Sequence, residues 1–518
     1  MGVDYGTMSG STIESKPIGV SDYDLVIVGA GISGINMAYR FQEHFRTGTY
    51  IVLEARKAMG GTWDLMKYPG IRSDSHLHSF GFEWKPWSEE NPIAEGGKIV
   101  RYLKEATAEN GIDEKIHYQH KVTKTSWQSR EQKWTLEVDA TGEAGEITKK
   151  LFRGKFMVLG TGYYDYDKAM TAEIPGIENF SGKVVHPQFW PEGLDYAHKK
   201  VAVIGSGATA ITLVPAMAKM AEKVTMVQRS PSYIVSLPNR IRPKTWWERI
   251  LPLWIQYKIN RIRYMIGGFF YRRYLAQNSD QMRESLAKIT QAQLPKHIPY
   301  DPHFKPRYRP WTQRVCVCPD GDFFKALHKG NVDIATGIIS TVTPNSITME
   351  NGQNVEADII VTATGLHIKY GGNADIYVDG EELKWGDKFF WRGVMIQDVP
   401  NMAFVMGYTM ATWTLGADAT ATLVCRMIKH LERNKLTSAT PRIPVVDVSG
   451  GQKEMVKLTS ASGVMGLTST YIKNAMHRLP KTSDDKPWRA RGNYLEDMWD
   501  ARWSSLSRGM QFVQAAQA

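Results

Sequence analysis

Residues 24–41 read DLVIVGAGISGINMAYRF, and this stretch decides the first part of the fold. Residues 24–28 form a short apolar run that predicts a buried strand, and the glycine-rich turn after it leads into a helical pattern over 35–45. TYIVLE, at 49–54, predicts a second strand that ends at Glu54. Strand, helix and strand within about 30 residues form a βαβ unit.

The glycine-rich turn has the spacing GxGxxG at Gly29, Gly31 and Gly34. Gly29 permits a tight turn, Gly31 lets the backbone approach a pyrophosphate, and Gly34 lets the helix pack close to the sheet. The free N–H groups at the start of the helix attract the phosphate. Glu54 lies 20 residues after Gly34, where a carboxylate can bind an adenosine ribose. We therefore predict a dinucleotide site; the alternative is a glycine turn without a ligand.

A second unit of the same kind starts at Lys200. KVAVIGSGATA, at 200–210, predicts a strand and a GxGxxA turn, and KVTMVQRS, at 223–230, predicts the next strand, which ends in no acid. A carboxylate there would repel a 2′-phosphate, whereas the guanidinium of Arg229 can bind it. We expect this site to prefer NADPH to NADH, with a surface role as the alternative for Arg229. The expected cofactor contacts are Gly205, Gly207, Ala208, Thr209 and Arg229.

Two dinucleotide sites in one chain imply electron transfer between two cofactors. The first site, with its acid, suits FAD, and the second, with Arg229, suits NADPH as the reductant. The paired turns therefore predict a flavoprotein oxidoreductase.

The remaining pattern supports an α/β fold. Residues 117–140 alternate between polar and apolar side chains, which predicts antiparallel strands. FMVLGTG, at 156–162, and ADIIVTATG, at 357–365, each predict a buried strand followed by a glycine turn. Residues 239–294 are rich in Arg, Trp and Tyr and have a helical pattern. We predict two Rossmann-like dinucleotide-binding domains with a helical insertion.

The predicted domains are discontinuous in sequence. The FAD-binding domain is expected at 1–170 and 366–518, the NADPH-binding domain at 171–238 and 306–365, and the helical insertion at 239–305.

The composition is ordinary for a protein of several domains, with 518 residues of which 42% are hydrophobic and 23% charged. The net charge is +11, but no nucleic-acid-binding motif is present, and two pyrophosphates would use part of this charge. Cys316, Cys318 and Cys425 fit neither a disulfide framework nor a metal site and are expected to be buried thiols. The oligomeric state is left open.

Three stretches bear on location in the cell. The first 20 residues lack a basic stretch followed by an apolar core, so a cytoplasmic location is expected. The most apolar stretch, around 402–425, contains Asp418 and favours a buried element over a membrane span. The basic, aromatic segment 239–275 allows weak association with a membrane surface as the alternative to an ordinary insertion.

Two further motifs resemble those of a known family. Residues 60–74 read GGTWDLMKYPGIRSD, and residues 180–191 read FSGKVVHPQFWP. With both glycine turns and the ATG at 363–365, they resemble the fingerprints of the Baeyer–Villiger flavin monooxygenases (class B flavoprotein monooxygenases) over nearly the whole chain, and most closely the ethionamide-activating group. The common family pattern is HTxxWP, so Pro187 is a departure. It favours this group, or a link to the flavin monooxygenases that oxidise nitrogen and sulfur.

The resemblance implies an activity. In this family NADPH reduces FAD, and the reduced flavin takes up O2 as a C4a-peroxyflavin. Attack on a ketone carbonyl gives an ester or lactone, and oxygen transfer to sulfur gives a sulfoxide. The expected partners are therefore a small ketone or thioether and O2, with FAD and NADPH as cofactors, no metal and no nucleic acid.

The resemblance also implies catalytic residues. Arg314, in PRYRPWTQRVCVCPDGDFF, matches the family's arginine, whose charge would stabilise the anionic peroxide. Asp74 matches the acid that holds this arginine, and it is also assigned to cofactor binding because it could contact the nicotinamide. A structural salt bridge between Asp74 and Arg314 is the alternative. Many relatives carry a lysine at the position of Gln313, directly before the arginine. The contact that this lysine would make to a phosphate is therefore expected to differ in this chain. Arg307 and Arg309 are rivals for the role of Arg314.

Further residues are expected near the cofactors by analogy. Thr62, Trp63 and Tyr68 are placed near the flavin or the nicotinamide ribose, with core packing as an equal alternative for the two aromatic residues. His186 is expected at a hinge between domains. Trp413, in GYTMATWTLG, is expected to border the substrate pocket.

The strand that ends in ATG is expected to lead back to the FAD domain. Ala363, Thr364 and Gly365 are assigned to cofactor binding, and Asp358 is expected, with Thr364, to line this crossing.

Three other functions compete. A flavin disulfide reductase needs a cysteine pair soon after the first unit, and residues 60–70 contain none. A flavin monooxygenase that oxidises nitrogen or sulfur, but not ketones, is the main alternative; the long 60–74 motif and Arg314 favour the Baeyer–Villiger type. A non-catalytic dinucleotide sensor or a membrane-associated binding protein would consume no O2 with NADPH.

Overall fold

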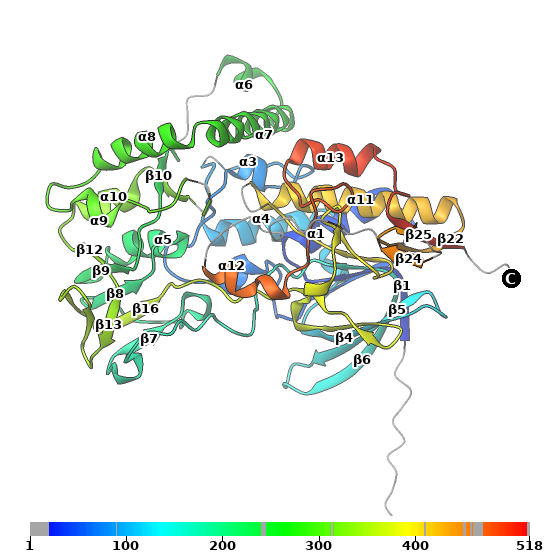
Figure 1. The fold of residues 1–518 in the computed structure, drawn as a ribbon, viewed down its shortest axis with the longest axis horizontal. Coiled ribbons are helices and arrows are strands. Elements are labelled where there is room, and N and C mark those ends of the chain that lie inside the picture. Colours follow the sequence, from blue (N-terminus) through cyan, green and yellow to red (C-terminus); the bar gives the residue numbers. More distant parts are fainter. Residues whose placement is uncertain are drawn as a thin grey trace, which may run out of the picture.

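The computed structural model describes residues 20–89, 91–239, 245–310, 312–313, 315–408, 411–448, 452–455, 458 and 470–514. Two sheets lie beside each other, one with 11 strands and one with five, and a row of helices runs along one edge of the molecule (Figure 1). This confirms the predicted α/β class.

The larger sheet is built around β1 (Val20–Val28). It pairs in parallel with β2 (Tyr50–Leu53) on one side and with β6 (Ile147–Leu159) on the other. Helix α1 (Ile32–His44) joins β1 to β2 and packs against the long helix α11 (Trp413–Arg433). The first predicted βαβ unit is therefore present, with its helix beginning three residues earlier than the apolar pattern indicated.

An antiparallel meander extends this sheet beyond β6. β4 (His120–Gln128) pairs with β5 (Lys133–Thr141), and β5 pairs with β6, as the alternating pattern predicted. Trp127 and Trp134 face each other across β4 and β5 and are fully buried, which fixes the register of the hairpin.

The smaller sheet is parallel throughout, in the strand order β12-β9-β8-β16-β7. Helix α5 (Ala208–Met217) follows β8 and packs against its own sheet. The strands are β7 (Lys183–Val185), β8 (Lys200–Ile204), β9 (Lys223–Gln228), β12 (Val332–Thr336) and β16 (Ile359–Thr362). The central strands β8 and β16 are mostly apolar and buried, which is typical of a parallel sheet covered on both faces.

A run of helices separates two parts of the smaller-sheet region. It comprises α6 (Trp246–Ile250), α7 (Leu253–Gln277), α8 (Ser279–Gln291) and α9 (Tyr300–His303). Figure 1 shows α6, α7 and α8 along the upper edge of the molecule. The segment is helical, as predicted. None of the described helices combines the length and the hydropathy that crossing a membrane requires.

The chain crosses between the two sheets twice, and the crossings pair with each other. Tyr164 forms a β-bridge with Ile368, and the backbone N–H of Asp165 donates to the carbonyl of His367 at 2.8 Å. The Asp165 carboxylate accepts from the side chain of Asn373 at 3.1 Å. Burial acts to raise the pKa of Asp165. The hydrogen bond from Asn373 and further hydrogen bonds outweigh the effect of burial and hold the pKa below its ordinary value.

The other elements complete the two layers. In the first half of the chain they are α2 (Thr62–Leu65), α3 (Leu77–Phe80), α4 (Gly96–Ala108), β3 (Ile116–His117) and β10 (Ile234–Leu237). The middle holds β11 (Cys316–Pro319), α10 (Asp322–Leu327), β13 (Ile339–Val342), β14 (Ser346–Met349), β15 (Asn354–Glu356), β17 (Asp375–Val378) and β18 (Glu381–Glu382). The C-terminal part holds β19 (Phe390–Trp391), β20 (Met395–Ile396), β21 (Met402–Phe404), β22 (Leu436–Pro441), β23 (Val445–Val448), β24 (Gln452–Met455), α12 (Thr470–Ala475), α13 (Tyr494–Trp503) and β25 (Met510–Gln514).

Backbone packing at the first turn explains two of its glycines. Gly29 has φ +100°, a conformation that favours glycine, and a Cβ there would lie 2.9 Å from the carbonyl oxygen of Gly160. A Cβ on Gly34 would lie 1.9 Å from the carbonyl oxygen of Gly29. The start of α1 therefore packs directly against the end of β1. A residue larger than glycine at position 29 or 34 would prevent this contact.

Gly34→Ala is expected to destabilise the fold, because the clashing atom is backbone and cannot rotate away. The free energy of unfolding should fall by about 2 kcal/mol or more. Gly97→Ala is the matched control, since an added Cβ on this exposed residue of α4 meets nothing within 4 Å. It should be neutral or stabilise by about 0.5 kcal/mol. Denaturant titration of both variants measures the difference, and equal midpoints would contradict the packing described.

Candidate active site

The first glycine turn presents open backbone donors. Gly31 is the N-cap of α1 and makes no side-chain capping bond, so the N–H groups behind it are available to an anion. A Cβ on Gly31 would meet its nearest atom only at 3.6 Å, in Gly61. There is therefore room for a ligand atom at the position that the GxGxxG spacing predicts.

Glu54 lies buried beside this turn, as its spacing predicted. One carboxylate oxygen accepts the N–H of Ala30 at 2.7 Å, and the other accepts the N–H of Arg56 at 2.9 Å. Burial raises the pKa of Glu54, although both backbone donors oppose the shift. Each oxygen keeps a second lone pair, which can accept a ribose hydroxyl.

A cavity of about 750 Å³ opens from the first turn. Thr62, Trp63 and Asp74, all from the 60–74 motif, line it, and so does Trp413 at the start of α11. The indole N–H of Trp413 donates to Ser33 in the turn at 2.9 Å, and its ring stacks on Tyr163. Trp413 therefore joins the first glycine turn to Tyr163, which also lines the cavity.

A second cavity, of about 680 Å³, opens from the second glycine turn. A Cβ on Gly207 would meet no atom within 4 Å, so this turn is also open to a phosphate. Arg229 lies at the cavity wall at the end of β9. The sequence-predicted residues that line this cavity are Gly205, Gly207, Ala208, Thr209, Arg229, Ala363, Thr364 and Gly365.

The two cavities share a wall. Tyr68 lines both, and its hydroxyl is hydrogen-bonded to Thr209 at the start of α5. Burial raises the pKa of Tyr68 to about 12, so it is a neutral hydroxyl at physiological pH. Arg72 donates to both carboxylate oxygens of Asp322 in α10. Side chains of the 60–74 motif thus bridge the two sheets where the cavities meet.

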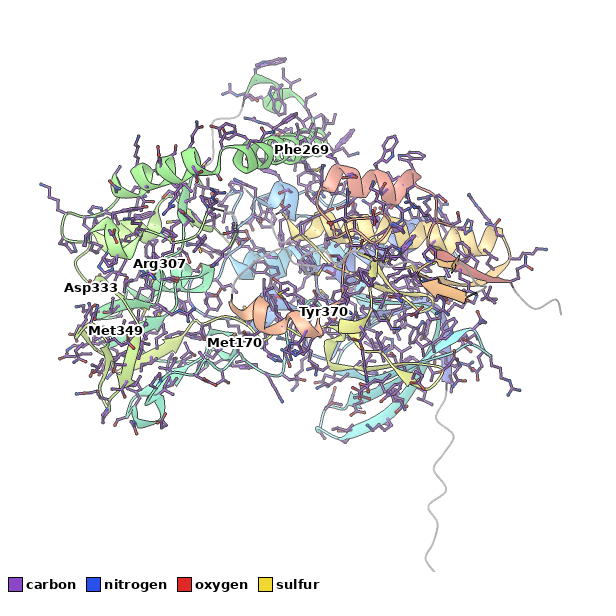
Figure 2. All side chains as sticks on the ribbon, in the orientation of Figure 1. Met170, Phe269, Arg307, Asp333, Met349 and Tyr370 are labelled. Atoms are coloured by element: carbon purple, nitrogen blue, oxygen red, sulfur yellow. The ribbon has the colours of Figure 1, made fainter. Side chains whose placement is uncertain are left out.

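The structure describes only one member of the predicted catalytic pair. Asp74 lies at the first cavity, whereas Arg314 lies outside the described residues. Gln313 lines the second cavity. The rivals Arg307 and Arg309 are exposed, and Arg309 is paired with Asp280 at 3.6 Å; Figure 2 labels Arg307 on the smaller-sheet side.

The expectation for Asp358 is wrong. This residue precedes β16, so it lies at the opposite end of the strand from the ATG turn, and its carboxylate accepts the N–H of Lys200 at 2.8 Å. Thr364, at the other end, does line the second cavity. His186 lines this cavity too; burial lowers its pKa, and its Nδ1 accepts the N–H of Gln188 at 3.2 Å.

Several cavity residues were not singled out from sequence. Gly160 and Gly162 line the first cavity, and the motif GTG to which they belong corresponds to the ATG of the second unit, so a signal was present. Tyr264, Gly267 and Gly268 of α7 also line it. Nothing local marks these three, because they reach the cavity only through the tertiary packing of α7 on α3.

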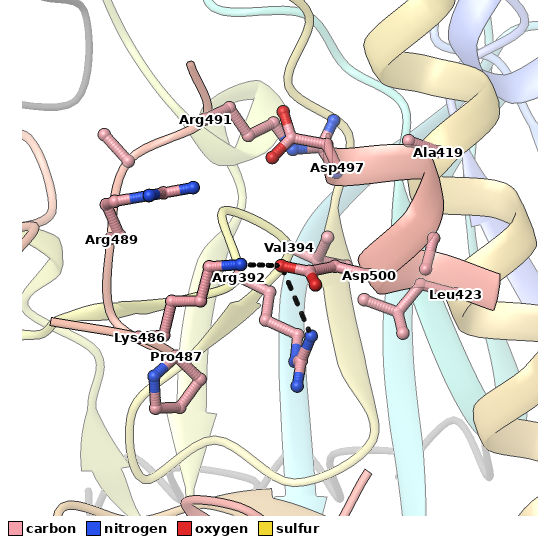
Figure 3. A pocket seen from close by; sticks show the side chains of 12 residues that line it. Arg392, Val394, Ala419, Leu423, Lys486, Pro487, Arg489, Arg491, Asp497 and Asp500 are labelled. Atoms are coloured by element: carbon pink, nitrogen blue, oxygen red, sulfur yellow. Dashed lines mark ion pairs between the residues drawn. The ribbon is translucent and has the colours of Figure 1, made fainter. Parts of the chain in front are cut away.

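A third, much smaller cavity has a structural role. It measures about 30 Å³, enough for a few water molecules, and lies between α13 and the chain at 486–491 (Figure 3). Asp500 pairs there with Lys486 at 3.1 Å and with Arg392 at 3.9 Å. This ion-pair network ties α13 to the rest of the molecule.

The two large cavities fit two dinucleotides. Each begins at a glycine turn with open space and at the N-terminus of a helix, and only the first turn has a buried acid beside it. The second has Arg229 at the corresponding place. The residues present therefore fit FAD in the first cavity and NADPH in the second.

Known proteins resemble this chain over nearly its full length. "FAD-containing monooxygenase EthA" of Mycolicibacterium smegmatis is 40% identical, over 93% of this chain and 95% of the relative. The chain belongs to the FAD-containing monooxygenases. "Probable FAD-binding monooxygenase AlmA" of Acinetobacter baylyi is also 40% identical, over 92% of each chain. The family recognised from the sequence motifs is confirmed.

Solved structures of monooxygenases share the fold. An oxidised steroid monooxygenase bound to NADP has a TM-score of 0.72 at 19% identity, covering 96% of this chain and all of that one. The polycyclic ketone monooxygenase of Thermothelomyces thermophila has a TM-score of 0.74 at 18% identity, covering 97% of this chain and 91% of that one. At these identities the likeness supports the fold alone.

A family model also matches residues 26–263 of this monooxygenase, with the description "Pyridine nucleotide-disulphide oxidoreductase". A disulfide reductase needs a redox-active cysteine pair at its flavin. Cys316, Cys318 and Cys425 are all buried thiols outside any disulfide, as predicted. Burial raises the pKa of the Cys318 thiol to about 12, which makes it a poor nucleophile. The match therefore reflects the shared dinucleotide-binding architecture.

Arg229→Ala is expected to weaken NADPH binding more than NADH binding, because only NADPH carries the 2′-phosphate. The ratio of the two KM values should change by an amount that corresponds to about 1–3 kcal/mol of binding free energy. Arg46→Ala, which removes an exposed arginine at the end of α1, is the control and should change neither KM. Equal losses for both nucleotides in Arg229→Ala would refute the assignment.

Proposed function

We propose that this monooxygenase uses FAD and NADPH to carry out Baeyer–Villiger oxidation, and also sulfoxidation. The overall reaction converts ketone, O2, NADPH and a proton into ester or lactone, water and NADP⁺. The observation that carries the proposal is the shared wall of the two cavities at Tyr68 and Thr209. It allows the nicotinamide and the flavin to meet, as hydride transfer requires.

FAD, when bound, accepts the hydride and activates O2, so the protein must orient, dry and polarise the site. Trp63, Phe80 and Trp413 contribute an apolar wall to the first cavity. An apolar wall suits a hydrophobic ketone or thioether and excludes water from the reacting oxygen. Tyr68 has no negative charge at physiological pH to repel a developing anion.

Arg314 is proposed to supply the positive charge at the reacting oxygen. In sequence it stands between Gln313, which lines the second cavity, and Val315, which lines the first. A guanidinium near their junction would stabilise the negative charge on the oxygen and on the tetrahedral adduct of the ketone. Asp74, at the wall of the first cavity, is proposed as the carboxylate that orients it.

Sulfur or nitrogen oxidation without ketone activity is the second candidate. Pro187 favours it, since this residue replaces the common threonine and lies at the wall of the second cavity. A soft sulfur needs no anionic oxygen, so that reaction would not depend on Arg314.

A product screen distinguishes these candidates. The purified flavin-bound protein is supplied with NADPH and O2, together with a methyl ketone, a cyclic ketone or a thioether. We expect ester or lactone from at least one ketone and sulfoxide from the thioether. Sulfoxide alone would replace the proposal with the second candidate, and NADPH oxidation without any product would refute both.

Arg314→Ala should separate flavin reduction from oxygen transfer. NADPH should still bleach the flavin, but ester formation should fall by about 100-fold or more, with H2O2 released instead. Arg309→Ala is the matched control, because Arg309 is exposed and paired with Asp280. It should keep the product yield of the original protein. Full ketone oxidation by Arg314→Ala would refute the role of this residue.

A further inference from the structure

Helix α7 buries two polar side chains and exposes several apolar ones. It buries the polar residues Asn260 and Arg261, whose side chains are 9% and 4% exposed. The Arg261 guanidinium donates to the carbonyl of Gly81 at 2.8 Å. The opposite side exposes Ile262 and Phe270, at 53% and 63%. A surface helix of a soluble domain normally faces its apolar side inward.

The exposed apolar side chains form a continuous stripe. Ile262, Ile266 and Phe270 recur every four residues, which places them on one side of α7. The exposed side chains of Trp254 and Tyr274 flank this side towards the two ends of the helix. Lys258 lies over the Trp254 ring, 5.5 Å from its centre. Singly exposed apolar residues are normal, but such a row is a patch of the kind that marks an interaction surface.

Neighbouring helices extend the patch. α6 exposes Trp246 and Ile250, and α13 exposes Trp499 and Trp503, each by 66% or more. α7 and α13 adjoin, because Met265 of α7 packs against the buried cluster that includes residues of α13. Figure 1 shows all three helices along the same edge. We call this surface the α6–α7–α13 face, defined by Trp246, Ile250, Leu253, Trp254, Ile262, Ile266, Phe270, Tyr274, Leu495, Trp499 and Trp503.

The charges on this face are mostly positive. The sequence of α7 contains no Asp or Glu, and Arg249, Lys258 and Arg263 are exposed. The acids of α13 are held in contacts within the protein: Glu496 pairs with Lys486 at 2.8 Å, and Asp500 pairs with the same lysine. The ion pairs of Asp500 are drawn in Figure 3. The face therefore combines Trp and aliphatic side chains with the exposed cations Arg249, Lys258 and Arg263.

We propose that the α6–α7–α13 face docks this protein onto an anionic lipid bilayer. Trp and basic side chains around aliphatic ones are the composition of helices that lie in the plane of the membrane interface. The described helices include none that could span the bilayer, so the contact is peripheral. A symmetric contact with a second copy fits less well, because it would bring the same cations of both copies together.

The location of the face has a consequence for substrates. Tyr264, Gly267 and Gly268, on the inner side of α7, line the first cavity. One helix thus separates the lipid-facing surface from the site, and apolar substrates dissolved in the membrane would enter beside it. This consequence rests on the proposed function, whereas the docking itself does not.

Flotation of the full-length protein with vesicles tests the docking. The protein should float with vesicles of equimolar phosphatidylglycerol and phosphatidylcholine, and far less with phosphatidylcholine alone or at high salt. Ile262→Gln combined with Phe270→Gln should weaken partitioning about tenfold or more, since both side chains lose apolar contact with the lipid. Lys258→Gln combined with Arg263→Gln should weaken binding several-fold, and only to the anionic vesicles.

Ile147→Gln is the matched control, because Ile147 is 64% exposed at the start of β6, outside the α6–α7–α13 face. It should bind vesicles like the original protein, and all variants should keep the melting temperature and the NADPH-dependent bleaching of the flavin. Absence of flotation, or equal flotation of the Ile262/Phe270 variant, would overturn the proposal. So would a dimer in solution that this variant dissociates, because a second copy would then cover the face. None of these readouts requires substrate turnover, so failure of the proposed reaction would leave the test intact.

Discussion

The close packing of the 60–74 motif on helix α5 is the constraint on which the site depends. Gly70 has φ +78°, and a Cβ there would lie 2.8 Å from the Cβ of Ala216 in α5. The absence of a side chain at Gly70 lets the motif reach the second nucleotide-binding unit, so that Tyr68 meets Thr209. Two separate glycine turns become one two-cofactor site through this contact. Catalysis by successive electron and oxygen transfer needs such proximity more than it needs any single acid or base.

The features of the fold and the site that could be predicted from sequence are those encoded within a few residues. Gly29, Gly31, Gly34 and Glu54 could be assigned because a turn, a helix start and a strand end follow one another in the chain. The same holds for Arg229 at the end of β9. The turns, helix starts and strand ends that position these groups are defined by neighbouring residues. The residue pattern alone therefore indicated their places in the fold.

The parts that sequence missed depend on contacts between distant segments. Asp358 was expected at the crossing because it is close in sequence to the ATG turn. The length of β16 separates the two in space, because Asp358 precedes this strand and the ATG turn follows it. Tyr264 borders the first cavity only because α7 packs over His76, with the rings 4.6 Å apart. The sequence also did not show which side of α7 is exposed. Apolar residues occur all along the helix, and only the fold determines which of them are buried.

The long helix α7 consequently has two functions in this account. Its inner side closes the cavity in which the oxygen is transferred, and its outer side forms the surface assigned to lipid. The anchoring of Arg261 to backbone carbonyls of the 78–81 segment keeps the helix in place over the 60–74 motif and the turn that follows it. Substrate access and cofactor chemistry are therefore coupled through one element.

The most direct test of the central claim is the fate of isotopically labelled dioxygen. The protein with FAD and NADPH is given a ketone or a thioether under the labelled gas, and the product is analysed by mass spectrometry against the NADPH consumed. We expect one labelled oxygen atom in each product molecule and one product molecule for each NADPH. Consumption of NADPH with no labelled product would contradict it.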